Sequence, residues 1–375
     1  MASREPGLTG GIPYVDLAKQ HAALKREILD AVAAVLEHGR FILGPEVEAF
    51  ERAMAARLGV VHAVGVASGT DALVLTLKAL GIGPGHEVIT VSHSFVATAS
   101  AIRLAGAQPV FVDVDDNSML LDPARLPLAL TPRSRAVLAV HLNGFPCAMD
   151  RIEAFCLEHG LALIEDCAQA LGVHWRGRAV GSFGVGCFSL HPLKPLSACG
   201  DGGFVTTRDD ELAERLRQLR NLGLRDRDHC DLVAGNTRLD TLQAAILLAK
   251  LPHLDDWLAA RRARARRYRE ALEGWVRLPP PEGEHVATYS AFVVRHPRRD
   301  ALRERLIARG IDAKVHYPLA IHQQAAFAGT GPWDLPVTER VVSEILSLPV
   351  SAELDAADQE RVIEAVQAAL REVAR

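Results

Sequence analysis

The sequence predicts an α/β protein, with a large domain built on a mainly parallel sheet covered by helices on both faces and a smaller C-terminal α/β domain. Two observations predict this fold class. Between about residues 55 and 210, short β-prone runs alternate with longer amphipathic stretches, as in proteins with parallel sheets. The proline-rich stretch 279–283 breaks this pattern, and a second strand–helix group follows it. A chain of 375 residues is long enough for two domains.

Seven runs qualify as strands of the large sheet, at 63–67, 87–91, 108–114, 136–141, 162–165, 185–190 and 203–207. Amphipathic helices are predicted between several of them, at 70–80, 96–104 and 149–159. A long helix is predicted at 251–275, before the proline-rich stretch. The second group comprises a strand at 288–295, a helix at 300–309, a strand at 313–316 and a C-terminal helix from about Asp355. We therefore expect a large domain at 12–250 and a small domain at 251–375, with the N-terminal segment 1–35 packed against the small one.

Composition and charge exclude several classes of protein. Hydrophobic residues make up 49% of the chain and charged residues 23%, as in ordinary soluble proteins, so disorder is excluded. The formal net charge of −4 gives no basic excess for nucleic acid, and we interpret the six arginines of 261–269 as a solvated helix face. No apolar run approaches the ~20 residues that cross a bilayer. The first residues lack the apolar core of a secretory signal, so we expect a cytoplasmic location.

The cysteines and histidines form no metal-binding pattern. The six cysteines contain no C-x-x-C pair, and the 15 histidines contain no H-E-x-x-H. Most of the cysteines lie inside apolar runs. We expect them to be reduced and buried, and we predict no metal site.

Three polar residues open the first helix of the alternating region. Ser68, Gly69 and Thr70 follow the strand at 63–67, where free amides and hydroxyls form a cradle suited to a phosphate. The same residues also fit an ordinary helix N-cap, and alone they do not decide between the two. Two other glycine-rich stretches, 81–85 and 181–186, precede strands and are predicted to be turns, so the sequence has no dinucleotide-binding fingerprint.

Asp166 and Lys194 each follow a predicted strand, and ligands of such sheets bind beyond the strands' carboxyl ends. Asp166 fits a partner for a cationic ring nitrogen, or alternatively a helix N-cap. Lys194 stands between Pro192 and Pro195 among apolar neighbours, where desolvation lowers the pKa of an amine and makes it a nucleophile. The alternative is a solvated lysine. The spacing allows both side chains to line one crevice.

A series of short motifs in a fixed order resembles one family, the pyridoxal-phosphate-dependent nucleotide-sugar aminotransferases of the DegT/DnrJ/StrS group, which have transferase fold type I. The motifs are S-G-T-D-A-L (68–73), S-F-V-A-T-A (94–99), P-V-F-V-D-V (109–114), E-D-C-A-Q-A (165–170), F-S-L-H-P-L-K (188–194), G-D-G-G (200–203), G-N-T-R-L-D (235–240) and H-Y-P-L-A-I-H-Q-Q (316–324). The resemblance covers about residues 12–370. It implies a large cofactor-binding domain with a seven-stranded sheet and a small C-terminal domain.

The resemblance also implies a role for each residue that matches a family motif. Lys194 matches the Schiff-base lysine, which also moves the proton between substrate and cofactor, and Asp166 matches the acid that keeps the pyridine nitrogen protonated. The implied cofactor is pyridoxal 5′-phosphate, which becomes pyridoxamine 5′-phosphate during the cycle. Its other implied contacts are a ring-stacking phenylalanine, a glutamine beside the ring, and phosphate ligands, namely Phe95, Gln169, Ser68, Gly69, Thr70 and Ser189.

Four further matches concern the partner subunit and the substrate. The asparagine at the position of Asn236 reaches the cofactor phosphate of the neighbouring subunit, which implies a homodimer with shared active sites. Arg238, Tyr317 and His322 fall where the family lines its substrate entrance. One branch of the family replaces the lysine with histidine and is a dehydratase, and Lys194 argues against that branch.

The expected function is a transfer of an amino group from an amino acid, with L-glutamate as the expected donor, to a nucleotide-linked keto-sugar for a surface glycan or an antibiotic sugar. Three positions depart from common family patterns: the run 143–145, Pro195 and Leu222. These departures leave open the same chemistry on a sugar phosphate or cyclitol ketone. A third alternative, from another class, is a regulator that keeps the fold and the cofactor without turnover.

Overall fold

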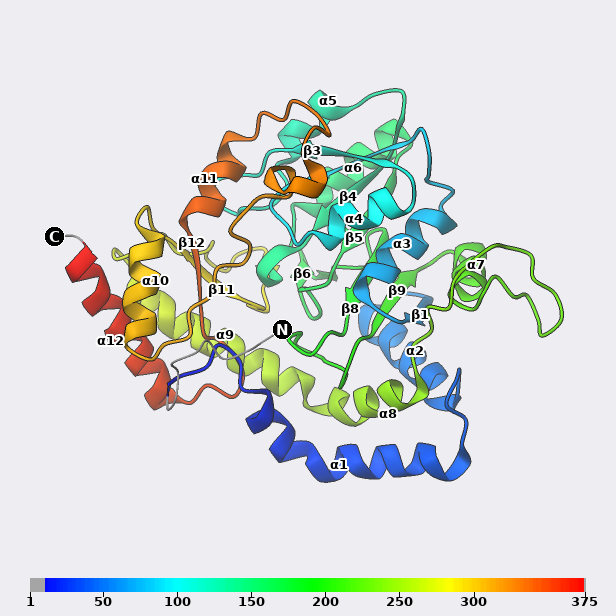
Figure 1. Ribbon diagram of the computed structural model, residues 1–375, viewed down its shortest axis with the longest axis horizontal. Coiled ribbons are helices and arrows are strands. Elements are labelled where there is room, and N and C mark those ends of the chain that lie inside the picture. The colour runs from blue at the N-terminus through cyan, green and yellow to red at the C-terminus, as the bar shows by residue number, and fades with distance from the viewer. Residues whose placement is uncertain (1–10, 374–375) are drawn as a thin grey trace.

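A seven-stranded sheet forms the centre of the computed structural model, which describes residues 11–373 (Figure 1). Its strand order is β1-β9-β8-β5-β4-β2-β3. The pairs from β8 to β3 are parallel, whereas β9 runs antiparallel to both of its neighbours. The strands are β1 His62–Val66, β2 Glu87–Val91, β3 Gln108–Val112, β4 Ser134–Val140, β5 Ala162–Asp166, β8 Val185–Ser189 and β9 Gly203–Thr207.

Helices cover both faces of this sheet, because successive side chains along a strand point to opposite faces and apolar residues occupy both. Neighbouring residues of β9 point to opposite faces: Phe204 packs with the rings of Phe50 and Phe188, while Val205 belongs to the other apolar cluster. The helices before residue 251 are α1 Leu17–His38, α2 Pro45–Leu58, α3 Gly69–Ala79, α4 Ala97–Leu104, α5 Leu126–Ala129, α6 Met149–His159, α7 Asp210–Arg220 and α8 Thr241–Lys250, with short 3₁₀ turns at Pro123–Arg125 and Leu142–Gly144.

All seven predicted strands are present, with ends that differ by one or two residues, and the three predicted helices between them correspond to α3, α4 and α6. The strand predicted to reach residue 114 ends at Val112. Its continuation is diverted because the Asp113 carboxylate accepts hydrogen bonds from the backbone N–H groups of Val337 and Thr338. Helices α1, α2, α7 and α8 were not predicted.

A second, smaller group of elements follows α8, and Figure 1 shows its helices α9, α10 and α12 gathered on one side of the molecule. Strands β11 and β12 pair antiparallel, and a separate small sheet has the order β10-β6-β7. The elements are β6 His174–Trp175, β7 Arg178–Ala179, α9 Leu254–Leu272, β10 His285–Val286, β11 Phe292–Arg295, α10 Arg299–Ala308, α11 Pro336–Glu344, β12 Ile345–Leu348 and α12 Ala356–Val373, with 3₁₀ turns at Leu251–His253, Ile321–Gln323 and Ala325–Phe327.

Three predictions for this group were wrong in detail. The helix predicted at 251–275 begins as a 3₁₀ turn around Pro252 and ends at Leu272, because Glu273 is extended. The strand predicted from residue 288 starts only at Phe292, since Tyr289 has a positive φ of 49°. The strand predicted at 313–316 is a single bridge between Lys314 and Ser347.

The arginine-rich stretch of α9 was wrongly interpreted as a solvated face. Arg261 is buried and donates to the carbonyl oxygen of Tyr289. Arg264 donates to the carbonyl oxygen of Ala352, and Arg267 forms two hydrogen bonds with the Glu360 carboxylate. These arginines therefore attach α9 to the C-terminal part of the chain.

All six cysteines are free, and four are buried as predicted. Cys199 and Cys230 are exposed, which corrects the prediction for these two. Among the described residues, no helix is long and apolar enough to cross a membrane.

The N-terminal segment contacts both groups of elements. Ile12 pairs with Ile311, and Lys19 donates to the carbonyl oxygen of Glu353, while α1 runs along α8. The first ten residues of the predicted segment 1–35 lie outside the described residues. The division of the chain near residue 250 stays a prediction.

Two glycines let the start of α3 approach the sheet closely. A Cβ on Gly69 would lie 2.7 Å from the Cβ of Ser189, and a Cβ on Gly203 would lie 2.5 Å from the carbonyl of Ser68. The backbone of β9 therefore passes directly beneath the turn that begins α3.

We expect Gly203→Ala to destabilise the fold, because its Cβ would meet backbone atoms that cannot move aside. The expected loss is about 1–3 kcal/mol in the free energy of unfolding, measured by urea denaturation. Gly283→Ala is the matched control, since no atom lies within 4 Å of an added Cβ there. Equal stability of the two variants would contradict this account of the contact.

Candidate active site

Asp166 and Lys194 line one cavity of about 410 Å³ at the carboxyl ends of β5 and β8. The two strands pair in parallel, with Asp166 opposite Cys187, so the residues that follow them emerge side by side. The structure thus brings the two residues into one crevice, as the sequence predicts. Ser68, Gly69, Thr70, Phe95, Gln169, Ser189 and Tyr317 line the same cavity.

The Asp166 carboxylate is nearly fully buried and is held by two hydrogen bonds. Thr98 donates its hydroxyl to Oδ2 over 2.8 Å, and the backbone N–H of Ala168 donates to Oδ1 over 3.2 Å. Ser94 lies 2.7 Å from the Thr98 hydroxyl and extends the network. Burial raises the pKa of Asp166, while these hydrogen bonds and the Lys194 charge oppose that rise. The carboxylate is therefore fixed in place and placed to receive a cation.

The Lys194 amine faces the cavity, and within residues 11–373 the structure gives Nζ no hydrogen-bond partner. Burial lowers the pKa of Lys194, and the charge of Asp166 partly opposes this effect. The backbone N–H of Lys194 donates to the carbonyl oxygen of His191 over 2.8 Å, which fixes the turn that presents the side chain. A free amine with a lowered pKa is available as a nucleophile or a base at lower pH than an exposed lysine.

The start of α3 forms the predicted anion cradle at another wall. Ser68 is the N-cap, and its hydroxyl oxygen accepts from the backbone N–H of Asp71 over 3.0 Å. The first-turn amides, which begin at Gly69, have no acceptor inside the helix, and they face the same cavity as the hydroxyls of Thr70 and Ser189. Amides, hydroxyls and the positive end of the helix dipole together suit a phosphate.

Gln169 connects two walls of the cavity. Its Oε1 accepts from the backbone N–H of Asn143 over 2.7 Å, and its Nε2 donates to the Tyr317 hydroxyl over 3.1 Å. The rings of Phe95 and Tyr317 lie 5.4 Å apart. Because Phe95 is half exposed, its ring offers an apolar surface to whatever enters the cavity.

The other three predicted site residues do not line the cavity of this chain. Asn236 is exposed on the segment that follows α7, and Arg238 donates to Asn221 Oδ1 over 3.0 Å. His322 lies between Ser92 and Glu339. The roles assigned to these residues stay predictions.

Several cavity residues were missed by sequence reasoning, namely Tyr14, Thr98, Asn143, His191 and His316. Asn143 and His191 lie inside quoted stretches, and Thr98 and His316 inside quoted motifs, so their position next to predicted site residues was the available signal. Tyr14 comes from the N-terminal segment and had no such signal. Burial and the charges of Lys194 and Lys314 lower the pKa of His316 to about 4, so this imidazole is neutral near pH 7.

The donor atoms of His141, Glu165 and Cys167, all buried, lie within 4.8 Å of one another, and His141 also lines the cavity. The Glu165 carboxylate, however, already accepts from the backbone N–H groups of Gly181, Phe183 and Gly184 and pairs with His141. A metal would have to displace these bonds, so we interpret the group as a hydrogen-bonded anchor for the turn before β8.

We expect Asp166→Asn to shift the titration of Lys194 to lower pH, because the variant removes the negative charge that favours the ammonium form. The measurement is the pH dependence of Lys194 acylation in ligand-free protein by mass spectrometry, with the exposed Lys25 as internal reference. Asp201→Asn, which also removes a carboxylate from the cavity wall, is the control and is expected to leave the profile in place. A shift to higher pH in Asp166→Asn would refute the proposed pairing.

Known aminotransferases are similar to this chain over nearly its whole length. A UDP-N-acetyl-3-dehydro-α-D-glucosamine 3-aminotransferase from Acidithiobacillus ferrooxidans is 46% identical over 345 residues, which cover 92% of this chain and 94% of that protein. A dTDP-3-amino-3,4,6-trideoxy-α-D-glucose transaminase from Streptomyces venezuelae is 44% identical over 364 residues, which cover 96% of each.

Two solved structures share the whole fold. An S. venezuelae structure, described as DesV in complex with a ketimine intermediate, has a TM-score of 0.94 at 44% identity and covers 96% of this chain and 98% of that chain. A Bacillus subtilis structure, described as ntda with bound cofactor PMP, has a TM-score of 0.90 at 28% identity. The match covers 99% of this chain and 87% of that chain.

These neighbours confirm the predicted fold class, fold type I of the pyridoxal-phosphate-dependent transferases, and the relatives confirm the predicted resemblance. Residues 22–367 match the corresponding family model. The chain belongs to the DegT/DnrJ/EryC1/StrS aminotransferase family.

Proposed function

We propose that this chain transfers an amino group from an amino acid, L-glutamate in the first instance, to a nucleotide-linked keto-sugar. One observation carries the proposal: the Lys194 amine, the buried Asp166 carboxylate and the anion cradle at the start of α3 line the same cavity. An amine that reacts with carbonyl groups, an acid for a ring nitrogen and a phosphate site are what a pyridoxal phosphate enzyme needs.

The cavity residues fit pyridoxal 5′-phosphate and its amine form, pyridoxamine 5′-phosphate. Ser68, Gly69, Thr70 and Ser189 would hold the phosphate. Because Gly69 has no side chain, the start of α3 can lie close enough to Ser189 for both to contact the same group. Asp166 would face the ring nitrogen, with Phe95 and Gln169 beside the ring. The bound cofactor supplies a conjugated ring that accepts the electron pair left when a proton leaves the substrate carbon.

The protein's own part in the chemistry is to hold charge and move one proton. Asp166 keeps the ring nitrogen protonated, and Thr98 and Ala168 keep that carboxylate in place. Lys194 would hold the cofactor covalently between turnovers and would then, as a free amine, carry a proton between the substrate and the cofactor. Its lowered pKa supports this second role, because the amine is more readily deprotonated than that of an exposed lysine.

The acceptor is proposed to be a sugar with its ketone at carbon 3. The names of the two relatives given above both place the amino group at carbon 3, on a UDP-linked sugar in one and a dTDP-linked sugar in the other. These names favour a nucleotide-linked acceptor over a sugar phosphate or a cyclitol ketone. The product would serve a surface glycan or an antibiotic sugar. The complete Lys194 and Asp166 site speaks against a regulator without turnover.

We also propose a cytoplasmic homodimer with shared active sites. Asn236 is exposed and lies outside the cavity of its own chain, which supports a role in the site of a partner. Leu36, Phe41 and Ile42 are exposed apolar side chains at the end of α1 and beyond it, and a subunit interface would cover them. The free state of all six cysteines supports a reducing compartment.

We expect the visible absorption of the cofactor-loaded protein to change when L-glutamate is added, because the donor step converts the cofactor to its amine form. Lys194→Ala is expected to lower turnover by roughly 10³-fold or more, since it removes both the covalent anchor and the proton carrier. Lys78→Ala, on the exposed last turn of α3, is the control. A spectrum that stays indifferent to every amino donor, or near-normal activity of Lys194→Ala, would overturn the proposal.

Mixed dimers test the shared site. We expect Lys194→Ala and Asn236→Ala homodimers to be inactive at low cofactor concentration, while a refolded equal mixture recovers roughly a quarter of the unmodified activity. The reason is that half of the randomly formed dimers are mixed, and each of these has one intact site and one doubly altered site. If the mixture is no more active than its components, Asn236 does not act across an interface.

A further inference from the structure

The segment 316–344, which we call the strap, leaves the small β11–β12 sheet and returns to it. Lys314 pairs with Ser347 of β12 just before the strap, and β12 begins directly after it, at Ile345. The strap carries Tyr317, which lines the cavity, and His322. The position of the strap over the large sheet therefore sets one wall of the site.

Ser92, the residue after β2, holds the first part of the strap. Its carbonyl oxygen accepts from the backbone N–H of Ile321 over 2.9 Å, and its hydroxyl oxygen accepts from the backbone N–H of His322 over 3.0 Å. The same hydroxyl lies 2.8 Å from His322 Nδ1, and Nε2 of that ring lies 3.2 Å from Oε1 of Glu339 in α11. His322 thus connects the sheet to the returning helix of the strap.

Asp113 holds the second part, where α11 begins. This carboxylate is nearly fully buried and follows β3 directly. It accepts from the backbone N–H of Val337 over 2.9 Å, from the backbone N–H of Thr338 over 2.8 Å and from the Thr338 hydroxyl over 2.7 Å. A carboxylate from one element caps the helix of another, and the helix dipole adds to the attraction.

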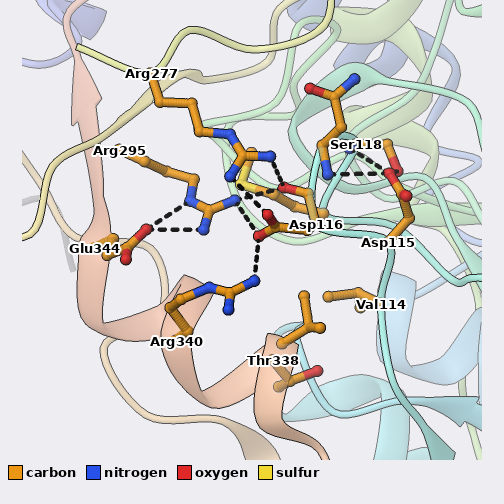
Figure 2. Close-up of polar contacts among 12 residues, drawn as sticks. Val114, Asp115, Asp116, Ser118, Arg277, Arg295, Thr338, Arg340 and Glu344 are labelled. Carbon is orange, nitrogen blue, oxygen red and sulfur yellow. Dashed lines mark hydrogen bonds and ion pairs between the residues drawn. The ribbon is translucent and has the colours of Figure 1, made fainter.

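Asp116, three residues further on, meets three arginines (Figure 2). Arg340 of α11 lies 2.9 Å from Oδ1, Arg295 of β11 lies 2.9 Å from the same oxygen, and Arg277 donates to Oδ2 over 2.7 Å. Burial raises the pKa of Asp116, but the hydrogen bonds from the arginines outweigh it and hold that pKa well below its usual range. Asp116 is therefore ionised at all moderate pH values and joins the loop after β3 to three segments of the C-terminal part.

Replacing Asp116 by a neutral residue does not leave the buried charge of Arg295 without a partner. The Arg295 side chain is 3% exposed and also pairs with Glu344 over 2.8 Å. Arg277 and Arg340 are partly solvated. Loss of the Asp116 charge therefore loosens the attachment of α11 but leaves the buried arginine compensated.

We propose that Asp116 is a positioning residue for the acceptor step, which holds the strap at the place where Tyr317 lines the cavity and meets the keto-sugar. The inference rests on the proposed function, and it assigns the cofactor to the wall with Lys194 and the sugar to the wall with Tyr317. A nucleotide-linked sugar is much larger than glutamate and extends further along the strap. The acceptor step is therefore the one that a displaced strap impairs.

The test measures the two half-reactions of Asp116→Asn separately. The donor half-reaction is the spectral change after L-glutamate alone. The acceptor half-reaction uses UDP-N-acetyl-3-dehydro-α-D-glucosamine and its dTDP-linked 3-keto counterpart, whichever the unmodified protein turns over faster. We expect the acceptor KM to rise roughly 10-fold or more, with donor half-reaction rates within about 2-fold of the unmodified protein.

Glu360→Gln is the matched control, because it breaks the two-bond pair with Arg267 between α9 and α12, away from the strap. Neither half-reaction is expected to change in this variant. Arg340→Gln removes the other partner of the same ion pair. Its effect on the acceptor kcat/KM is therefore expected to be non-additive with that of Asp116→Asn.

Three outcomes would overturn the positioning role: equal loss in both half-reactions, an unchanged acceptor KM in both variants, or strict additivity of the two substitutions. If Asp116→Asn does not fold, the test rests on Arg340→Gln, which should raise the acceptor KM and leave the rate of the donor half-reaction unchanged. Failure of the donor half-reaction in the unmodified protein would instead contradict the proposed function. Turnover of neither sugar would reject the proposed acceptor and this inference with it.

Discussion

The pairing of a carboxylate and an amine at neighbouring strand ends is the constraint on which the rest of the site depends. Burial makes either charge costly by itself, and it raises the pKa of Asp166 while it lowers that of Lys194. Each charge reduces the cost of the other. The carboxylate has the Thr98 hydroxyl and a backbone N–H as further donors, whereas the amine has no described partner and stays free to react. This asymmetry separates a fixed acid from a mobile base.

The sheet turns this pair into a site by bringing an anion cradle to the same edge. Parallel pairing of β5 and β8 places Asp166 beside the chain that leads to Lys194. The antiparallel β9 then passes under the start of α3, where only glycine at position 203 leaves room for the Ser68 backbone. The cradle and the residues Asp166 and Lys194 thus share one cavity, because glycines at positions 69 and 203 let the start of α3 approach β8 and β9 closely.

Sequence reasoning found the parts of this arrangement that local pattern determines. Strand alternation predicted all seven strands, and strand ends pointed to Asp166 and Lys194. The cradle followed from the place of Ser68, Gly69 and Thr70 at the start of a helix, and the family motifs pointed to Phe95 and Gln169, which line the same cavity. It missed Thr98, whose bond to Asp166 spans 68 residues, and Tyr14, which no motif marks. Sequence reasoning also predicted a solvated arginine face on α9, because the partners of Arg264 and Arg267 lie about 90 residues away in the sequence. Contacts between distant segments, and not local propensity, decide these features.

The two walls of the cavity differ in the forces that position them, and this difference has a functional consequence. The wall with Asp166, Lys194 and the cradle belongs to the buried sheet and its immediate loops, where any displacement breaks backbone pairing. The strap wall is attached by a serine, two aspartates and a small apolar cluster around Phe111 and Trp333. Substitutions can move or reshape it without disturbing the charge pair. Relatives at 44–46% identity have names that specify aminotransferases of different nucleotide sugars, a difference that a variable strap wall beside a constant sheet wall would allow.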